Sequence, residues 1–498
     1  MQTFNSTAMK LTILKQTFLL LTIVTTGIHC GKDFLNNPTK NILLRQEYVK
    51  DLPSCQAFLN GIYLQFYSSF SHYKTAYPEV IADNLKPETG FGALMSIYSW
   101  DQQALEENGA IPILGLASVN MNAIYQSDYL LIRSCNLLIN AVGKFRDENP
   151  SRVDDMQGQA LLIRSMAYFQ LVNTFSQAYN FTPGGSHPGV AILTSDDWTI
   201  AINGRASVAE VYEEMIKDLQ GAITLLPATT ESLLLPSKLT AQALLARIYL
   251  FKGDFMNAKN TAAAVIIQKP LLTVKNGYPN NIFKSLSPQQ TETIFQMLPR
   301  KLLSNDNGTL QSGYYLGEYL RDTKKYFTAT SDLTDLLTAR KNDVRTQWIT
   351  KTNNSNDVTK FPTGIFAPSG SESTQYYQSI IRSSELYLTA AESFAQLSME
   401  DSARHYLYLI RKRADSTITF PAAVGPQLLD SIKIERRKEL AFEGLRLYDL
   451  QRWKQGIERS DPLSPNVKSL PYPSEKSIAP IPKMDTKFHG VTQNPGYK

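Results

Sequence analysis

Two polar segments of the chain, residues 96–103 and 305–322, combine aromatic rings with short polar side chains. Flat rings stack on the C–H faces of sugars, while amides and carboxylates bond to sugar hydroxyls. The alternative is that these rings anchor long loops onto the core. Trp100 is the best single candidate for stacking. The residues predicted to contact a ligand are Trp100, Tyr98, Asp101, Tyr314, Tyr315 and Asn305.

The sequence gives little support for catalysis, metal binding or nucleotide binding. There are five histidines and three cysteines, and no CxxC, HExxH, GxSxG or GxxxxGK[ST] pattern occurs. Residues 305–308 (NDNG) resemble the start of a calcium loop but lack its closing Glu. We therefore predict no catalytic residue, no metal site and no cofactor.

The charge balance gives no support for a nucleic-acid partner. The chain has 50 Lys and Arg against 45 Asp and Glu, a net charge of +5. Lys10 and Lys15 lie in a segment that we expect to be removed, and their loss leaves +3. In a basic cluster at residues 433–440 (KIERRKEL), Glu435 and Glu439 recur at helical spacing. This spacing predicts a solvated, salt-bridged helix face.

The N-terminus reads as a lipoprotein signal peptide over residues 1–29. Lys10 and Lys15 precede an apolar stretch at about 18–28, and Cys30 follows. The apolar stretch is shorter than the roughly 18–20 residues that span a bilayer. We expect Cys30 to be acylated and to anchor the mature chain in a membrane. The alternative is a cleaved signal with a soluble product.

Apolar residues recur at spacings of three and four along most of the chain, so we predict a mainly α fold. Strand-like alternation is confined to short pieces at 189–193 and 293–298. Long irregular segments at 84–122, 180–206, 270–330 and 350–378 separate the helices. Residues 461–498 contain seven prolines and should run extended over the helical body. The predicted helical ranges are 50–68, 123–145, 155–179, 207–226, 238–268, 380–413 and 427–457.

Several of these helices share a common pattern. Residues 242–266 align with 387–410, with Gly253 and Ser398 at the turn between two helices. Small residues let paired helices approach closely, and an aromatic fills the wedge between them, as in tetratricopeptide repeats. Such stacked pairs favour a binding scaffold over an enzyme. The equivalent positions are Ala246 and Ala391, Tyr249 and Phe394, and Ala258 and Ala403.

Residues 432–453 (IKIERRKELAFEGLRLYDLQRW) and 479–498 together resemble the closing signature of SusD/RagB outer-membrane lipoproteins of Bacteroidetes. The resemblance covers nearly the whole chain as one SusD-like domain, residues 30–498. We divide it into an N-terminal half at 30–230, a repeat pair with ligand-side loops at 231–330, and a C-terminal half at 331–498. The tripeptide GIH before Cys30 departs from the usual small residue. Supporting matches lie at 158–172, 205–227, 237–255 and 382–397.

The resemblance implies a tetratricopeptide-like helical face that docks on a SusC-like TonB-dependent transporter. It also implies a loop-rich face that captures an oligosaccharide or peptide nutrient without turnover. The protein would be lipid-anchored in the outer membrane and would face the exterior.

Two other functions stay open. One is a lipid-anchored helical-repeat scaffold that binds only protein partners, and the other is an α-helical glycoside hydrolase. A hydrolase needs one carboxyl group with a raised pKa, whereas the arginines of residues 432–453 should lower the pKa of the acids among them. We therefore interpret this block as structural, and expect Asp449 to pair with a neighbouring arginine.

Overall fold

The structure is a computed structural model, and its chain divides into two compact units, Met1–Lys50 and Asp51–Lys498. All the helices and strands below belong to the second unit. The structure describes residues 49–70, 73–88, 94–103, 121–196, 204–283, 292–297, 302–303, 310–311, 320, 327–353, 355–361 and 377–497.

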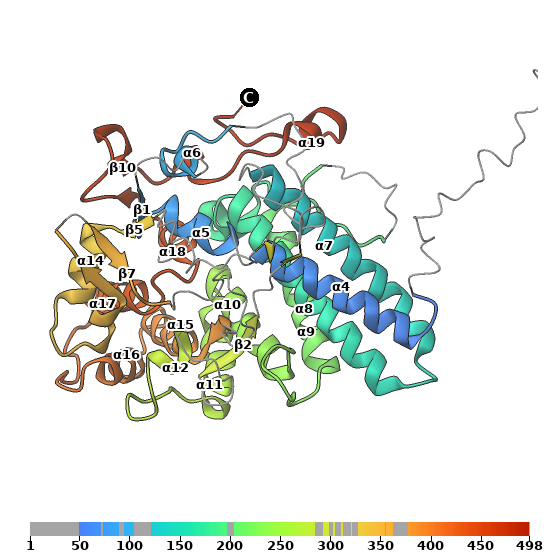
Figure 1. The fold of residues 1–498 in the computed structure, drawn as a ribbon, viewed down its shortest axis with the longest axis horizontal. Coiled ribbons are helices and arrows are strands. Elements are labelled where there is room, and N and C mark those ends of the chain that lie inside the picture. Colours follow the sequence, from blue (N-terminus) through green and yellow to red (C-terminus); the bar gives the residue numbers. More distant parts are fainter. Residues whose placement is uncertain are drawn as a thin grey trace, which may run out of the picture. The chain divides into compact units, whose positions relative to one another are not determined.

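Long helices pack against one another through the N-terminal part of this unit, where α8 is buried between α7 and α9 (Figure 1). The ends of these helices follow from their capping residues. Asn149 accepts a hydrogen bond from the Arg152 backbone N–H at the start of α8, and Ser207 and Glu210 form a capping box on α9. The helices are α4 (Leu52–Phe70), α7 (Met121–Val142), α8 (Pro150–Phe175) and α9 (Val208–Leu225).

The predicted repeat is confirmed as two helical hairpins, α10–α11 and α15–α16. Gly253 (φ 82°) and Ser398 (φ 58°) adopt left-handed backbone at the two turns, which ends the first helix of each pair. All four alanines at the equivalent positions are fully buried. The bounds are α10 (Lys238–Lys252), α11 (Phe255–Gln268), α15 (Ser383–Gln396), α16 (Glu400–Ala414) and α17 (Gly425–Glu439), which packs on α15 and α16.

Strands in the described ranges form only two-stranded antiparallel ribbons. The strand predicted at 293–298 is confirmed as β2, but the one at 189–193 is wrong. There the chain makes an isolated bridge from Pro188 to Ser207, because α9 begins at the next residue and leaves no strand to pair with. The ribbons join β1 (Leu85–Pro87) to β5 (Phe327–Ala329), β2 (Thr293–Met297) to β8 (Gln378–Arg382), β3 (Leu302–Leu303) to β4 (Leu310–Gln311), β6 (Ile349–Lys351) to β7 (Asn356–Val358), and β9 (Ile457–Glu458) to β10 (Ser469–Leu470).

The proline-rich C-terminal segment is mostly extended, as expected, but it also contains a short helix, α19 (Lys483–Phe488). This helix begins directly after Pro482, where a missing N–H costs nothing. Gln177 after α8 donates to the carbonyl of Ser474, which ties the segment to the helical body. The other short helices are α5 (Tyr73–Val80), α6 (Met95–Tyr98), α12 (Asn280–Phe283), α14 (Ser331–Thr338) and α18 (Arg446–Arg452).

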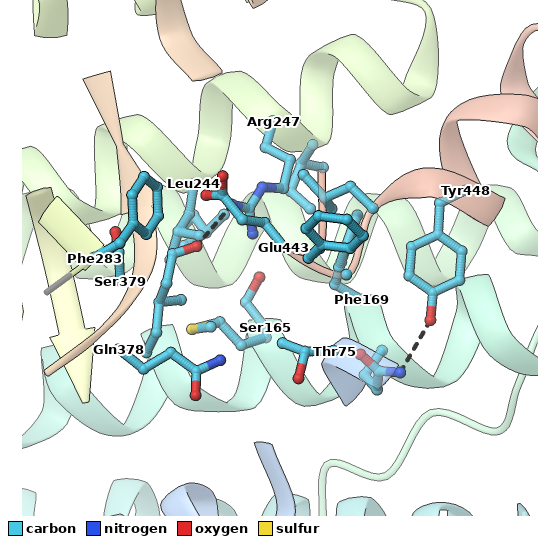
Figure 2. Close-up of a pocket in the computed structure, with 18 of the residues that line it drawn as sticks. Thr75, Ser165, Phe169, Leu244, Arg247, Phe283, Gln378, Ser379, Glu443 and Tyr448 are labelled. Atoms are coloured by element: carbon cyan, nitrogen blue, oxygen red, sulfur yellow. Dashed lines mark hydrogen bonds between the residues drawn. The ribbon is translucent and has the colours of Figure 1, made fainter. Parts of the chain in front are cut away.

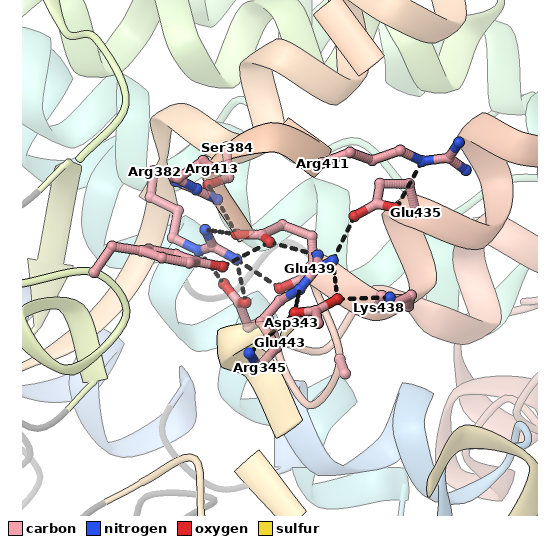
Figure 3. Close-up of polar contacts among 12 residues, drawn as sticks. Asp343, Arg345, Arg382, Ser384, Arg411, Arg413, Glu435, Lys438, Glu439 and Glu443 are labelled. Atoms are coloured by element: carbon pink, nitrogen blue, oxygen red, sulfur yellow. Dashed lines mark hydrogen bonds and ion pairs between the residues drawn. The ribbon is translucent and has the colours of Figure 1, made fainter. Parts of the chain in front are cut away.

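The prediction of a solvated face for residues 433–440 is wrong. Glu435, Arg436 and Glu439 are at most 2% exposed, and their helix α17 lies against α14, α15 and α16 instead of water. The acids meet arginines from other elements in a buried network (Figure 3). Helical spacing shows which charges share a helix face, but burial depends on what packs there. The expected pairing of Asp449 is confirmed, since Arg452 Nη2, three residues further along α18, lies 2.9 Å from its carboxylate. Arg436 Nε of α17 adds a second contact at 2.8 Å.

No helix within the described ranges is long and apolar enough to cross a bilayer.

Candidate functional site

The antiparallel pairing of β1 with β5 brings together residues that flank, in sequence, the two segments whose composition predicts ligand binding. Lys86 faces Thr328 in this ribbon. Strand β1 precedes α6 and residues 96–103 in sequence, and β5 begins at Phe327, shortly after the 305–322 segment. Only tertiary structure could bring together residues about 240 positions apart.

The C-terminal signature holds this ribbon in place. Arg446 donates through Nε and Nη2 to the Asp83 carboxylate at 2.6 and 2.8 Å, two residues before β1. Arg437 donates to the Asn84 side chain at 2.9 Å. Burial alone would raise the pKa of Asp83, but these two arginines lower it to about 2. The side chains of residues 432–453 therefore position the site without lining it.

Glu79, near the end of α5, makes a second connection to the same signature. The backbone N–H groups of Phe442, Gly444 and Leu445 donate to its carboxylate at 3.2, 2.9 and 3.3 Å. Burial raises the pKa of this carboxyl group. Its bonds satisfy buried amide groups of the loop that connects α17 to α18.

A polar cleft of about 410 Å³ lies beside the β1–β5 ribbon. Small-ligand sites commonly measure roughly 300–1,000 Å³, so the volume suits a short oligosaccharide. Its walls come from β1, β5, the start of α14, the β6–β7 turn and residues 461–463. Hydroxyl, amide and charged groups line it, among them Lys86, Glu88, Thr328, Ser331, Asn356 and Asp461.

Charged groups in the cleft are partly tied to one another. Lys86 Nζ donates to Asp461 Oδ2 at 2.9 Å, and the backbone N–H and hydroxyl of Ser331 also donate to that carboxylate. Ser331 opens α14, so the carboxylate also lies at a helix N-terminus. Hydrogen bonds within the protein thus hold this part of the wall together.

Two of the residues predicted to contact ligand, Tyr98 and Trp100, are buried at 0% and 4% exposed. The Arg459 guanidinium lies over both rings, 3.8 Å from the centroid of Tyr98 and 4.3 Å from that of Trp100. Trp100 also donates to the Ile81 carbonyl at 2.9 Å. In this structure both rings anchor their loop onto the core, the alternative that the sequence left open, and their role with ligand stays a prediction.

The guanidinium group of Arg459 is bound by backbone carbonyl groups. It donates to the carbonyls of Ala82, Tyr98 and Ile81 at 2.8 Å each. Burial lowers its pKa to about 10, so it remains charged at neutral pH. The side chain thus joins the end of α5, α6 and strand β9 beside the cleft.

The remaining predicted residues divide into exposed and undescribed positions. Asp101 is exposed and accepts a hydrogen bond from Gln103 at 3.0 Å. Four predicted residues lie outside the described ranges, namely Asn305, Tyr314, Tyr315 and the lipidation site Cys30.

Sequence reasoning missed the cleft residues. Lys86, Thr328, Asn356 and Asp461 belong to four separate segments of the chain, and none sits in a recognisable motif. What these residues share is that each is polar and lies in or near a very short strand. This pattern is too common in sequences to identify a ligand site.

A second cavity lies in the interior, between α8, α10, β8 and the start of α18 (Figure 2). Its free volume is about 40 Å³, enough for a few water molecules but not for a sugar. Phe169, Leu244 and Phe283 are among the residues that line it. The polar groups Arg247 and Glu443 at its edge are bound by Glu385 and Arg382. We therefore assign the ligand site to the cleft.

Within the part of the chain that the structure describes, no three His, Cys, Asp or Glu side chains come together as metal ligands. Cys55 and Cys135 are buried, and each is a free thiol.

Comparison with known proteins gives consistent matches along the chain. A family model described as "Starch-binding associating with outer membrane" matches residues 49–250, and a model described as "SusD family" matches residues 314–497. "SusD-like protein P2" of Formosa agariphila is 26% identical, and the alignment covers 97% of this chain and 99% of that protein.

Solved structures give the same assignment. A putative sugar binding protein of Bacteroides vulgatus is 26% identical with a TM-score of 0.74, covering 90% of this chain and 99% of that one. A SusD superfamily protein of Bacteroides thetaiotaomicron has a TM-score of 0.76 at 24% identity, covering 89% and 100%. Since both halves of the chain, its full-length relative and its fold agree, the protein belongs to the SusD/RagB family.

Proposed function

We propose that this protein binds a glycan nutrient at the cleft beside the β1–β5 ribbon and delivers it to a SusC-like TonB-dependent transporter. The observation that carries the proposal is the cleft of about 410 Å³ beside the ribbon, which is lined by hydroxyl, amide and charged groups. Family membership supports it, as do the match to a starch-binding family model and the likeness to a putative sugar binding protein of B. vulgatus.

Delivery requires a surface for the transporter and an anchor in the outer membrane. The paired helices α10–α11 and α15–α16 are the proposed docking surface, because stacked helical repeats present broad, rigid faces. Acylation of Cys30 is the proposed anchor, with the protein facing the exterior.

Binding without turnover is the expected activity. A glycoside hydrolase requires a carboxyl group that is free to give or take a proton. Catalysis of this kind uses a pair of carboxyl groups. Of the two described carboxylates in the cleft lining, Glu88 and Asp461, the second is held by Lys86 and Ser331, which leaves the pair incomplete.

The test is binding of the full-length protein, purified in detergent, to arrayed oligosaccharides and peptides. Asn356→Ala should weaken glycan binding about five- to tenfold, the worth of one hydrogen bond of roughly 1–1.5 kcal/mol. Asn260→Ala on the exposed side of α11 is the matched control and should bind normally.

Four results would contradict the proposal. Release of new reducing ends would indicate a hydrolase, binding to protein partners alone would indicate a scaffold, and selective peptide binding would replace the ligand class. Equal binding by the Asn356 variant and the parent would place the glycan elsewhere.

A further inference from the structure

The charged side chains that line the cleft indicate which ligand charge it accepts. This inference rests on the proposed glycan function. The charged side chains among its described lining residues are Lys86, Glu88 and Asp461. The ammonium of Lys86 is neutralised by Asp461 at 2.9 Å. Glu88 is partly buried, and its carboxylate makes no hydrogen bond or ion pair within the described part of the chain. The described walls thus hold one uncompensated negative charge.

We propose that the cleft selects uncharged glycans and discriminates against sulfated or uronate-rich ones. Proteins recognise sulfate and carboxylate groups with arginine or lysine side chains whose donors are free. Among the described lining residues the single cation, Lys86, is already engaged by a carboxylate that Ser331 holds in place. An anionic sugar would therefore have to break this ion pair to gain a cationic partner.

Glu88 contributes both to attraction and to rejection. A carboxylate accepts hydrogen bonds from sugar hydroxyls, and such charge-assisted bonds are stronger than neutral ones. The same carboxylate repels a sulfate placed beside it, and like charges at an interface are costly. Glu88 would thus be the residue that determines charge specificity.

The net charge of the chain acts in the opposite direction. At +5, or +3 after the expected loss of Lys10 and Lys15, the chain attracts anions at long range, so a preference for uncharged ligands would have to arise locally in the cleft. This opposition makes the inference testable, because a nonspecific electrostatic effect would favour the sulfated ligand.

The experiment uses the full-length protein in detergent and a panel of glucan, xylan and galactan hexasaccharides, each in unmodified and chemically sulfated form. The parent should bind the unmodified form of its preferred backbone about tenfold more tightly, or more. Glu88→Lys should remove most of this ratio. Glu231→Lys changes the net charge equally at an exposed position outside the cleft lining, and should preserve the ratio within about twofold.

Tighter binding of the sulfated form by the parent would overturn the inference while leaving glycan binding intact. An equal change of the ratio in both variants would also overturn it, because the effect would then be nonspecific. Failure of every backbone in both forms would remove the proposed glycan function and this inference with it.

Discussion

At the scale of single residues, Glu439 shows why the charged block of the signature is buried. Its carboxylate accepts from Arg345 at 2.9 Å, Arg382 at 2.8 Å and Arg413 at 2.6 Å, and from the hydroxyl of Tyr278 at 2.9 Å. Burial would raise its pKa, but the three guanidinium groups lower the pKa well below its usual range. One acid thus joins α17 to β8, α16 and the segment that contains Arg345.

Replacement of this acid should therefore be costly. Glu439→Gln keeps the shape of the side chain but removes the negative charge that three buried arginines share. We expect a loss of about 3–5 kcal/mol in the free energy of unfolding. Urea unfolding followed by circular dichroism measures it. Glu458→Gln on exposed β9 is the control, and a similarly small loss in both variants would argue against the buried network.

Acid should unfold the protein through its paired carboxyl groups. Burial raises the pKa of Asp83 and of Asp343, but their basic partners Arg437, Arg446, Arg345 and Lys438 lower both to about 2. Both folded-state pKa values lie below the pKa of about 3.9 that an Asp has in the unfolded chain. Between about pH 2 and pH 4 the unfolded chain therefore binds more protons than the folded protein. Stability present above about pH 4 is then lost as the pH falls toward 2.

This dependence is measurable as unfolding free energy against pH. Asp83→Asn should be less stable at pH 7 and should lose less stability between pH 4 and 2 than the parent. An identical slope in the two proteins would show that Asp83 does not contribute to the loss.

At the scale of elements, the two hairpin turns reach the same backbone geometry with different residues. Gly253 adopts φ 82° without a side chain to clash, whereas Ser398 holds φ 58° with one. The strands are short as well. Three residues each of β1 and β5 are enough to pair parts of the chain that are about 240 positions apart.

Relief of strain at the second turn should stabilise the protein. Ser398→Gly removes the cost of a left-handed side chain, and we expect a gain of about 0.5–1 kcal/mol in thermal or urea unfolding. Gly253→Ala, the reverse change at the equivalent turn, should lose about 1 kcal/mol. Opposite signs at the two turns are the diagnostic result, and a loss in both would count against equivalent geometry.

At the scale of the whole molecule, the proposal combines a helical docking surface, a polar cleft and a lipid anchor in one chain. The cleft depends on the signature of residues 432–453, since Arg437 and Arg446 hold the segment before β1. If the cleft binds ligand as proposed, recognition and the stability of the helical body share these arginines.

The proposed lipid anchor can be tested in cells that naturally produce the protein. Cys30→Ala should prevent acylation and shift the protein from the membrane fraction to the soluble fraction. Immunoblots of fractionated cells measure the shift, with Cys55→Ala as a control that should stay with membranes, because Cys55 is a buried thiol. Membrane attachment that persists without Cys30 would exclude a lipid anchor there.

The sequence alone determined the features that depend on local spacing. Apolar periodicity located the long helices, small residues identified the repeat, and Gly253 and Ser398 located its turns, because each is a property of neighbouring residues. The placement of Asp449 beside an arginine also followed from helical spacing.

Tertiary structure decided what depends on contacts between distant segments. Glu435 and Glu439 have the spacing of a solvated face, yet they are buried because β8 and α16 bring arginines to them. Trp100 looks available for stacking in sequence, yet Arg459, more than 350 residues away, covers its ring. The cleft itself is assembled from Lys86, Thr328 and Asp461, whose approach depends on the folding of the chain between them and not on local pattern.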